Sequence, residues 1–400
     1  MVRGNLATLA GDHVSNVVVF VSDSLRYDAV PESIAGMGVY GRGVSGSTFT
    51  ASGYPSILTG QYPSTHRVWN FEDALAERPP LLTQHGKSGV DATDVWTNVD
   101  DPAKKPPLRI PGETEDTTLS ELESPYVHVV HDRGGHMIYG DSDEEDRWDD
   151  HDEFFNDFAG ESERIAERYR ESVRESLANF RSIVEALKAR GEYDETLVVL
   201  TSDHGELLGE YGGLYTHGVP IVPELVDVPM LFAGAGFPEG VRFDGLLSTT
   251  DVAPTALSAV GARAPAAEGY DLWTGELPRP RVARTEVWKE TSYDYVTYQG
   301  SAVWTESGGH VRRLDPLPNR LLHFAGLQLY YASYANMVRR PSPGLYSAVK
   351  LHVTETTTFG NPPSRSLVDD HLVTDFSRLD GGIDQATPDT HQLRELGYLE

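Results

Sequence analysis

Cysteine is absent from this sequence of 400 residues, and its absence excludes three kinds of chemistry at once. The protein has no disulfide bond, no thiolate metal ligand and no cysteine nucleophile. Long apolar runs are also missing, both near the N-terminus and elsewhere, so we find neither a signal peptide nor a membrane-spanning segment. We therefore expect a cytoplasmic protein that does not insert into a membrane.

Lysine is scarce, and basic residues as a whole are far outnumbered by acids. Lysine and arginine together number 33, against 61 aspartates and glutamates, which gives a formal net charge of −28. Such a charge repels itself in dilute salt and is tolerated where salt screens it, so the composition indicates a halophilic protein. Nucleic acid is excluded as a partner because it is bound by clustered cations. An anionic small molecule remains possible if a metal ion supplies positive charge.

Short apolar runs alternate with helical segments along the first two-thirds of the chain. Continuous runs of this kind are typical of strands buried on both faces of a parallel sheet. They are Val17–Val21, Tyr126–Val130, Leu197–Leu200 and Val228–Phe232. Apolar residues recur at helical spacing over Ser162–Arg190, and Gly191 follows as a stop signal. The pattern predicts an α/β fold, a doubly wound sheet with helices on both faces.

The pattern of the chain changes near Arg284. Residues Val287–Leu314 alternate between apolar and polar side chains in the manner of antiparallel strands. We predict a catalytic domain over residues 1–285 and a small C-terminal α+β subdomain over residues 286–400 that packs on it.

Two of the apolar runs end in residues that can bind metal. Asp23 follows the first run, and Asp203 with His204 follows the third. Ligands bind beyond the carboxyl ends of the strands in such sheets, so these three side chains are expected to converge. Two carboxylates and an imidazole suit Mg²⁺, Mn²⁺, Ca²⁺ or Zn²⁺. The alternative for each aspartate is a helix N-cap after its strand.

Three segments resemble the signatures of the sulfatase family in the alkaline phosphatase superfamily, and they occur in the family's order. They are Val17–Arg26, which ends Asp-Ser-Leu-Arg, Thr50–Pro63, which ends Leu-Thr-Gly-Gln-Tyr-Pro, and Ser202–Glu210. The closing segment Leu393–Leu399 also resembles a common family ending. The resemblance implies an alkaline-phosphatase-like fold and an enzyme that hydrolyses a phosphate or sulfate ester.

Carried over residue by residue, the resemblance makes Asp23, Asp203 and His204 metal ligands. It places Thr50 at the position of the nucleophile, which also binds the metal. Sulfatases have cysteine or serine there, oxidised to formylglycine, and threonine cannot yield that aldehyde. Unmodified threonine resembles instead the phosphodiesterases, phosphatases and phosphotransferases of the superfamily. We therefore predict metal-dependent hydrolysis of a phosphate mono- or diester through a covalent Thr50 intermediate.

A second metal site is possible on the segment that follows Tyr126–Val130. Asp132 and His136 resemble the Asp-x-x-x-His pair of two-metal phosphodiesterases, and His217 falls where sulfatases carry an active-site lysine. These three residues would complete a two-metal site. With one metal ion, His136 and His217 would instead be general acids or anion contacts. The sequence leaves both arrangements open.

Three alternatives to phosphate-ester hydrolysis also remain. They are a sulfatase, a phosphotransferase with a sugar or lipid acceptor, and a non-catalytic relative that only binds metal. The first two share the predicted substrate class, a small molecule, glycan or lipid that carries a phosphate or sulfate ester. The non-catalytic alternative is less favoured, because the sequence retains Asp23, Thr50, Asp203 and His204 together.

Overall fold

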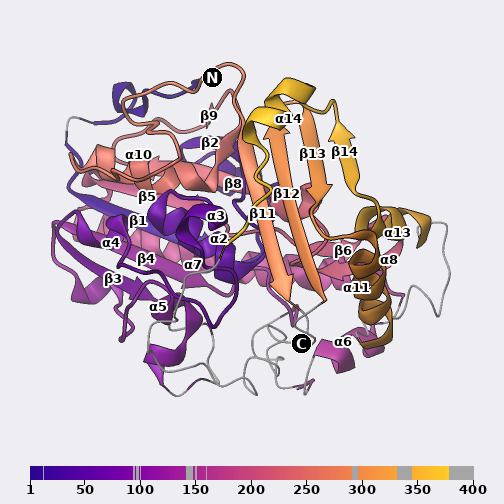
Figure 1. Cartoon of the computed structure of the whole chain (residues 1–400). Helices are drawn as coiled ribbons and strands as arrows, with labels where there is room; N and C mark the ends of the chain where they lie inside the picture. The colour runs from indigo at the N-terminus through magenta and orange to yellow at the C-terminus, as the bar shows by residue number, and fades with distance from the viewer. Residues whose placement is uncertain are drawn as a thin grey trace.

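The computed structural model describes residues 1–11, 13–92, 95, 99, 101–140, 147–148, 151–158, 160–290, 296–330 and 345–377 (Figure 1). The predicted closing segment Leu393–Leu399 lies outside the described residues. The strands are β1 (Asn16–Ser22), β2 (Val39–Val44), β3 (Lys87–Asp91), β4 (Tyr126–Asp132), β5 (Thr196–Thr201), β6 (Leu207–Gly209), β7 (Leu214–Thr216), β8 (Asp227–Gly234), β9 (Val241–Arg242), β10 (Leu247–Ser248), β11 (Ala283–Glu290), β12 (Thr297–Thr305), β13 (Gly308–Arg313) and β14 (Thr356–Gly360). The α-helices are α1 (Glu32–Ala35), α2 (Thr50–Thr59), α3 (Pro63–His66), α4 (Pro80–Thr83), α5 (Pro106–Arg109), α6 (His151–Asp157), α7 (Ser162–Arg190), α8 (Glu210–Gly213), α9 (Pro223–Val226), α10 (Val252–Ala259), α11 (Leu317–Tyr330), α13 (Leu345–Val353) and α14 (Arg365–His371).

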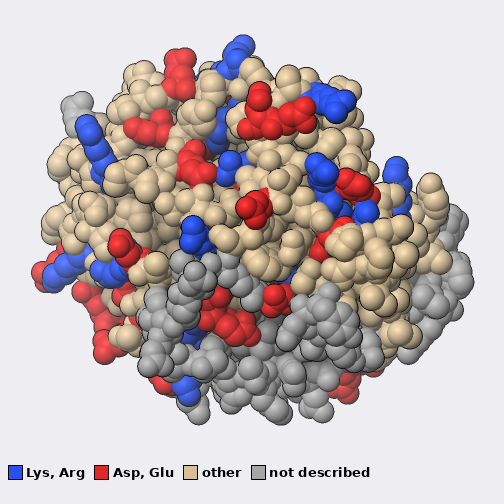
Figure 2. Space-filling view, viewed as in Figure 1, with Lys and Arg blue, Asp and Glu red and all other residues tan. Residues whose placement is uncertain are grey.

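Charged side chains of both signs lie at the surface. On the face shown in Figure 2, patches of aspartate and glutamate lie near patches of lysine and arginine, separated by other residues. Ion pairs join several of these side chains, such as Arg242 with Glu32 and Arg312 with Glu355. Exposed pairs of this kind contribute little to stability, so we do not assign the fold's stability to them.

The larger sheet has the strand order β10-β2-β8-β5-β1-β4-β3, with β9 beside β2. β1 runs parallel to both β4 and β5, and β3 runs parallel to β4. Every residue of β1, β4 and β5 is buried, as their continuous apolar sequences predict. Because these three strands are parallel neighbours, their carboxyl ends meet at one edge of the sheet.

β8 does not follow the predicted parallel direction. It runs antiparallel to both β5 and β2, so the sheet is mixed. Gly234 at the end of β8 pairs with Leu197 near the start of β5, at the edge opposite the carboxyl ends of β1 and β5. The prediction was wrong because a continuous apolar run reports burial on both faces of a strand and carries no information about its direction.

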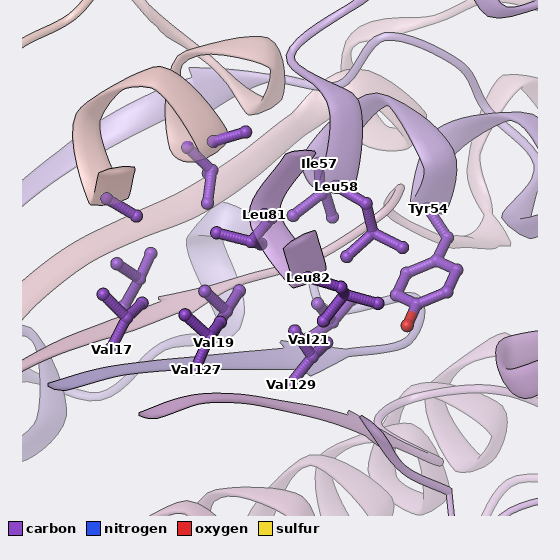
Figure 3. Close-up of a cluster of buried hydrophobic side chains, with 14 of the residues drawn as sticks. Val17, Val19, Val21, Tyr54, Ile57, Leu58, Leu81, Leu82, Val127 and Val129 are labelled. Carbon is purple, nitrogen blue, oxygen red and sulfur yellow. The ribbon is translucent and has the colours of Figure 1, made fainter. Parts of the chain in front are cut away.

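Both faces of the sheet are covered, as predicted for a doubly wound fold. Val17, Val19 and Val21 of β1 belong to a hydrophobic cluster that also contains side chains of α2 and α4 (Figure 3). Val18 and Phe20 point to the other face, where their cluster includes the apolar side of α7. The strict alternation along β1 therefore assigns each side chain to one of two helical layers.

The predicted helix over Ser162–Arg190 is confirmed as α7. Gly191 ends it in the left-handed conformation at φ 71°, and its N–H donates to the carbonyl oxygen of Lys188 at 3.0 Å. Glycine adopts this conformation without the steric penalty that a Cβ imposes. Among the described helices, α7 included, none combines the length and apolar composition that crossing a bilayer requires.

The C-terminal part of the chain forms a second, antiparallel sheet in the order β11-β12-β13-β14, accompanied by α11, α13 and α14 (Figure 1). The alternating segment Val287–Leu314 corresponds to β11 through β13, as predicted. β11 begins at Ala283, so the predicted domain boundary at residue 285 falls within this strand. The α/β fold with a separate C-terminal α+β part is confirmed.

The first residues of β11 bind the loop that follows β2. The hydroxyl of Thr285 donates to the carbonyl oxygen of Ser45 at 2.7 Å, and the N–H of Glu286 donates to that of Gly46 at 2.9 Å. One hydrophobic cluster contains residues of both parts of the chain, among them Val44, Leu207, Ile221, Val287, Tyr298 and Trp304. The two sheets are therefore joined by a common core.

Candidate active site

The carboxyl ends of β1 and β5 bring two aspartates to the same edge of the larger sheet. Asp23 directly follows β1, and Asp203 lies just beyond β5. Val21 of β1 is in register with Thr201 of β5, so the two strands end close to each other. Both carboxylates are buried, with 2% and 0% of their residue surface exposed. Ser24 connects them, because its N–H donates to Oδ1 of Asp203 at 3.4 Å and its hydroxyl donates to Oδ1 of Asp23 at 3.0 Å.

Thr50 is the first residue of α2, and the start of this helix holds its hydroxyl against both strand ends. Its Oγ1 lies 3.3 Å from Oδ2 of Asp23 and 3.0 Å from Nε2 of His204. Gly53 allows the helix to approach this closely, since a Cβ there would lie 2.4 Å from the carbonyl oxygen of Asp203. The structure thus brings together the four residues predicted around the first metal.

His204 presents Nε2 to the two carboxylates. Its Nδ1 lies 2.8 Å from the carbonyl oxygen of Gly205, which can only accept, so Nδ1 carries a proton and a neutral ring has its lone pair on Nε2. Nε2 lies 3.5 Å from Oδ1 of Asp23 and 3.8 Å from Oδ2 of Asp203. This lone pair can accept the Thr50 proton or bind a cation.

His131, the penultimate residue of β4, is a further member of this cluster that sequence reasoning missed. Its Nε2 lies 3.8 Å from Oδ2 of Asp203, too far for a hydrogen bond. Within the described part of the chain, neither ring nitrogen of His131 nor Oδ2 of Asp203 has a hydrogen-bond partner. Donor atoms of Asp23, His131 and Asp203 all lie within 4.8 Å of one another. Buried polar atoms left unbonded around one point fit an ion that completes their bonding.

Asp132, predicted as a ligand of a second metal, faces the other side of the sheet from His131. Successive residues of a strand point to opposite faces. The Asp132 carboxylate accepts hydrogen bonds from the N–H of Gly134 at 2.8 Å and from the side chain of Asn179, on α7, at 2.9 Å. The structure therefore does not bring Asp132 together with the two histidines that were predicted to share its metal.

Those two histidines extend the cluster in a different way. The ring centroids of His204 and His217 lie 4.4 Å apart, and those of His217 and His136 lie 4.9 Å apart. Oε2 of Glu206 lies 3.1 Å from Nδ1 of His217. Glu206 was not among the residues predicted from the sequence. His217 is thus oriented by a carboxyl group, an arrangement suited to proton transfer at its other ring nitrogen.

Burial shapes the proton affinities of this pair. It raises the pKa of Glu206 to about 8, although the neighbouring His204 acts in the opposite direction. Burial and the proximity of His204 lower the pKa of His217 well below its usual value. An uncharged Glu206 and an uncharged His217 can therefore share one hydrogen bond near neutral pH.

The two aspartates favour the binding of a cation. Burial and the charge of Asp203 raise the pKa of Asp23 well above its usual value. Burial acts on Asp203 in the same direction, but His204 and His131 outweigh it and lower the pKa of Asp203. Two adjacent buried carboxylates repel each other when both are ionised, and a divalent cation reverses that cost. The donor set of carboxylate oxygens and imidazole nitrogens fits one such ion.

Binding measurements on two neighbouring residues can test this assignment. We expect His131→Ala to weaken the affinity for a divalent cation by about 10- to 100-fold, the range seen when a residue that supports a metal site is lost. Asp132→Asn, on the opposite face of β4, should leave the affinity within about threefold of the wild type, well below that range. Mn²⁺ titration by calorimetry measures both. Equal losses in the two variants would contradict the separation of these side chains by the sheet.

Comparison with known sequences finds one family model and several relatives that this chain resembles. Residues 113–262 match the sequence model of the family described as Sulfatase. The chain is 35% identical over 414 residues to the low-salt glycan biosynthesis sulfotransferase Agl7 of Haloferax volcanii, with 100% of both chains covered. It is 29% identical over 150 residues to the multifunctional alkaline phosphatase superfamily protein PehA of Trinickia caryophylli, which covers 35% of this chain and 28% of that protein.

Solved structures resemble the whole fold. A 2-O GAG sulfatase matches with a TM-score of 0.60 at 16% identity, covering 90% of this chain and 92% of that one. The phosphonate monoester hydrolase of Agrobacterium radiobacter matches with a TM-score of 0.54 at 14% identity, covering 84% and 96%. At such identities the likeness concerns the fold alone.

Proposed function

The chain belongs to the sulfatase family of the alkaline phosphatase superfamily, and on that premise we propose that it transfers a sulfuryl group to a glycan hydroxyl. The observation that carries the proposal is the position of Thr50, whose hydroxyl lies between Asp23 and His204 in a buried cluster that fits a cation. The name of the full-length relative, a sulfotransferase of glycan biosynthesis, supports the choice of group and acceptor.

Threonine excludes the usual sulfatase mechanism and permits transfer. A formylglycine hydrate has two hydroxyls, so one can attack sulfur and the other can expel sulfate by breaking a carbon–oxygen bond. Thr50 has a single hydroxyl. Its sulfate ester can be released only by a second attack at sulfur. Water as the second nucleophile gives hydrolysis, and a glycan hydroxyl gives transfer.

The residues of the cluster can move the protons that transfer requires. Thr50 Oγ1 attacks sulfur, and the bond between sulfur and the donor oxygen breaks. The Thr50 proton passes through the histidines to the donor oxygen. The acceptor hydroxyl then attacks the sulfo-threonine, the bond from sulfur to Oγ1 breaks, and the acceptor proton returns to Thr50. His217, held by Glu206 at 3.1 Å, and His136 beside it are placed to relay these protons.

A divalent cation held by Asp23, Asp203, His204 and His131 would lower the pKa of the Thr50 hydroxyl and offset the charge of the sulfuryl oxygens. The predicted hydrolysis of a phosphate ester would use the same atoms. We favour sulfate over phosphate because the full-length relative is a sulfotransferase, and one metal ion over two because the Asp132 carboxylate accepts hydrogen bonds from Gly134 and Asn179.

An acceptor-dependence assay in molar potassium chloride tests the proposal. Nitrophenyl sulfate serves as donor and a methyl hexoside as acceptor, with Mg²⁺, Mn²⁺, Ca²⁺ or Zn²⁺. We expect nitrophenol release to rise with acceptor concentration and mass spectrometry to detect the sulfated sugar. Release at a rate independent of acceptor, with inorganic sulfate as product, would identify a sulfatase. Turnover of nitrophenyl phosphate or bis-nitrophenyl phosphate alone would support the earlier prediction of phosphate-ester hydrolysis.

A further inference from the structure

Lys289 reaches the site from the C-terminal sheet. It is near the end of β11, where it pairs with Tyr298 of β12. Its amino group lies 4.9 Å from the centroid of the Phe49 ring. Phe49 directly precedes Thr50, and its ring stacks on that of His217 with centroids 6.3 Å apart. A residue distant in sequence thus places a positive charge against the side chain of the residue that precedes the proposed nucleophile.

The backbone beside His217 leaves room for this side chain. A Cβ at Gly218 would lie 3.4 Å from Nζ of Lys289 and 3.6 Å from its Cδ, so the lysine extends along the glycine at van der Waals distance. The segment is fixed, because the N–H of Gly218 donates to the carbonyl oxygen of Thr48 at 2.7 Å. The lysine is also close enough to contribute, after burial and His204, to the lowered pKa of His217.

The ammonium group of Lys289 has no acidic partner among the described residues. Other cations in this part of the chain are paired: Arg281 binds Asp251 at 2.8 Å, and Arg284 binds Glu268 at 2.7 Å. Lys289 is half-buried, in a chain with nearly twice as many acids as bases. A partly desolvated cation without a counter-charge has a free energy cost that a bound anion removes.

We infer that Lys289 binds the anionic oxygens of the sulfuryl group as the substrate enters the site. The inference rests on the proposed function, and it gives the C-terminal sheet a direct part in recognising the substrate. The cation beside Asp23 and the lysine beside Phe49 then both bind the group. Lys289 is a binding residue in this scheme, and Thr50 with the histidines performs the chemistry.

Equilibrium binding of inorganic sulfate to the magnesium-loaded protein tests Lys289 without requiring turnover. We expect Lys289→Met, which keeps the aliphatic stem, to weaken sulfate binding about tenfold, the loss of one charge-assisted contact. Lys289→Arg should bind within about threefold of the wild type because it retains the charge. Lys350→Met, at an exposed position on α13, is the matched control and should not change the affinity.

The results distinguish a role of Lys289 in binding sulfate from a role in packing on Phe49. Sulfate affinity of Lys289→Met within about twofold of the wild type would overturn the inference, because one charged contact is worth more. So would equal losses in the methionine and arginine variants, since they would point to packing on Phe49. Lys289→Gln replaces the methionine variant if that protein does not fold. A lysine-dependent sulfate affinity without acceptor-dependent turnover would sustain the inference while the proposed transfer failed.

Discussion

Replacing Thr50 by alanine is expected to lower sulfuryl transfer by at least about 1,000-fold, in line with the loss of other enzymic nucleophiles. The variant retains Asp23, Asp203 and His204 and so keeps the other proposed metal ligands, but it lacks the oxygen that attacks sulfur. Thr50→Ser restores that oxygen and should recover most of the rate. Single-turnover kinetics measure the step directly, and intact-protein mass spectrometry of quenched wild type should detect one added sulfuryl group.

Ser52→Ala is the matched control for this prediction. Ser52 lies two residues after Thr50 in the same helix, and its hydroxyl oxygen is 2.7 Å from the hydroxyl oxygen of Ser47. We expect this variant to react at nearly the wild-type rate. If Ser52→Ala were inactive and Thr50→Ala active, the nucleophile would be Ser52 and the register of the signature would be wrong.

Removal of divalent metal is expected to lower both activity and stability. An ion at 1,000 times its dissociation constant stabilises the folded state by about 4 kcal/mol, because the unfolded chain does not assemble the site. Chelation should therefore abolish transfer and lower the unfolding temperature by several degrees. Thermal unfolding with and without added Mg²⁺, Mn²⁺, Ca²⁺ or Zn²⁺ in molar salt measures the effect and ranks the ions. An unfolding temperature that none of them shifts would argue against the metal site.

Asp23→Asn separates loss of the metal from loss of the fold. Burial and Asp203 raise the pKa of Asp23, so its ionised form destabilises the metal-free protein. A group whose pKa is raised by folding contributes stability below its unfolded pKa and loses it as the pH rises through the folded value. At pH 8 the asparagine should therefore make the metal-free protein more stable than wild type, while removing the stabilisation by metal. A metal-free variant less stable than wild type would contradict this balance.

Much of the site could be predicted because strand ends and helix starts are local features. The carboxyl ends of β1 and β5 carry Asp23 and Asp203 in a pattern that the sequence displays directly, and the signature around Thr50 is contiguous. Parallel neighbours then bring these residues together without any knowledge of side-chain packing. The alternation of β1 between two hydrophobic layers follows from the same reasoning.

The omission of His131 from the residues predicted around the first metal shows where this reasoning ended. Val127 and Val129 share a layer with Val17 and Val19, and the period of two along β4 places His131 on that same side. Counting from those valines would have identified His131 as the residue that faces Asp203. The direction of β8 had no such signal.

Glu206 and Lys289 could not be found from the sequence for a different reason. Glu206 matters because its carboxyl group meets His217 across the β6–β7 hairpin, and Lys289 because a second sheet packs beside α2. The first contact depends on the register of a short hairpin and the second on how distant segments pack, and neither periodicity nor a local motif records these features.

The attachment of β11 to the loop after β2 limits how this protein can diversify. The beginning of the strand, at Thr285 and Glu286, fixes the loop that leads to the nucleophile, and its end carries Lys289. A recombination event that replaced the C-terminal sheet would change both the orientation of the Thr50 hydroxyl and the binding of the substrate. New specificities should therefore arise by substitutions within an inherited pair of sheets rather than by shuffling one of them between lineages.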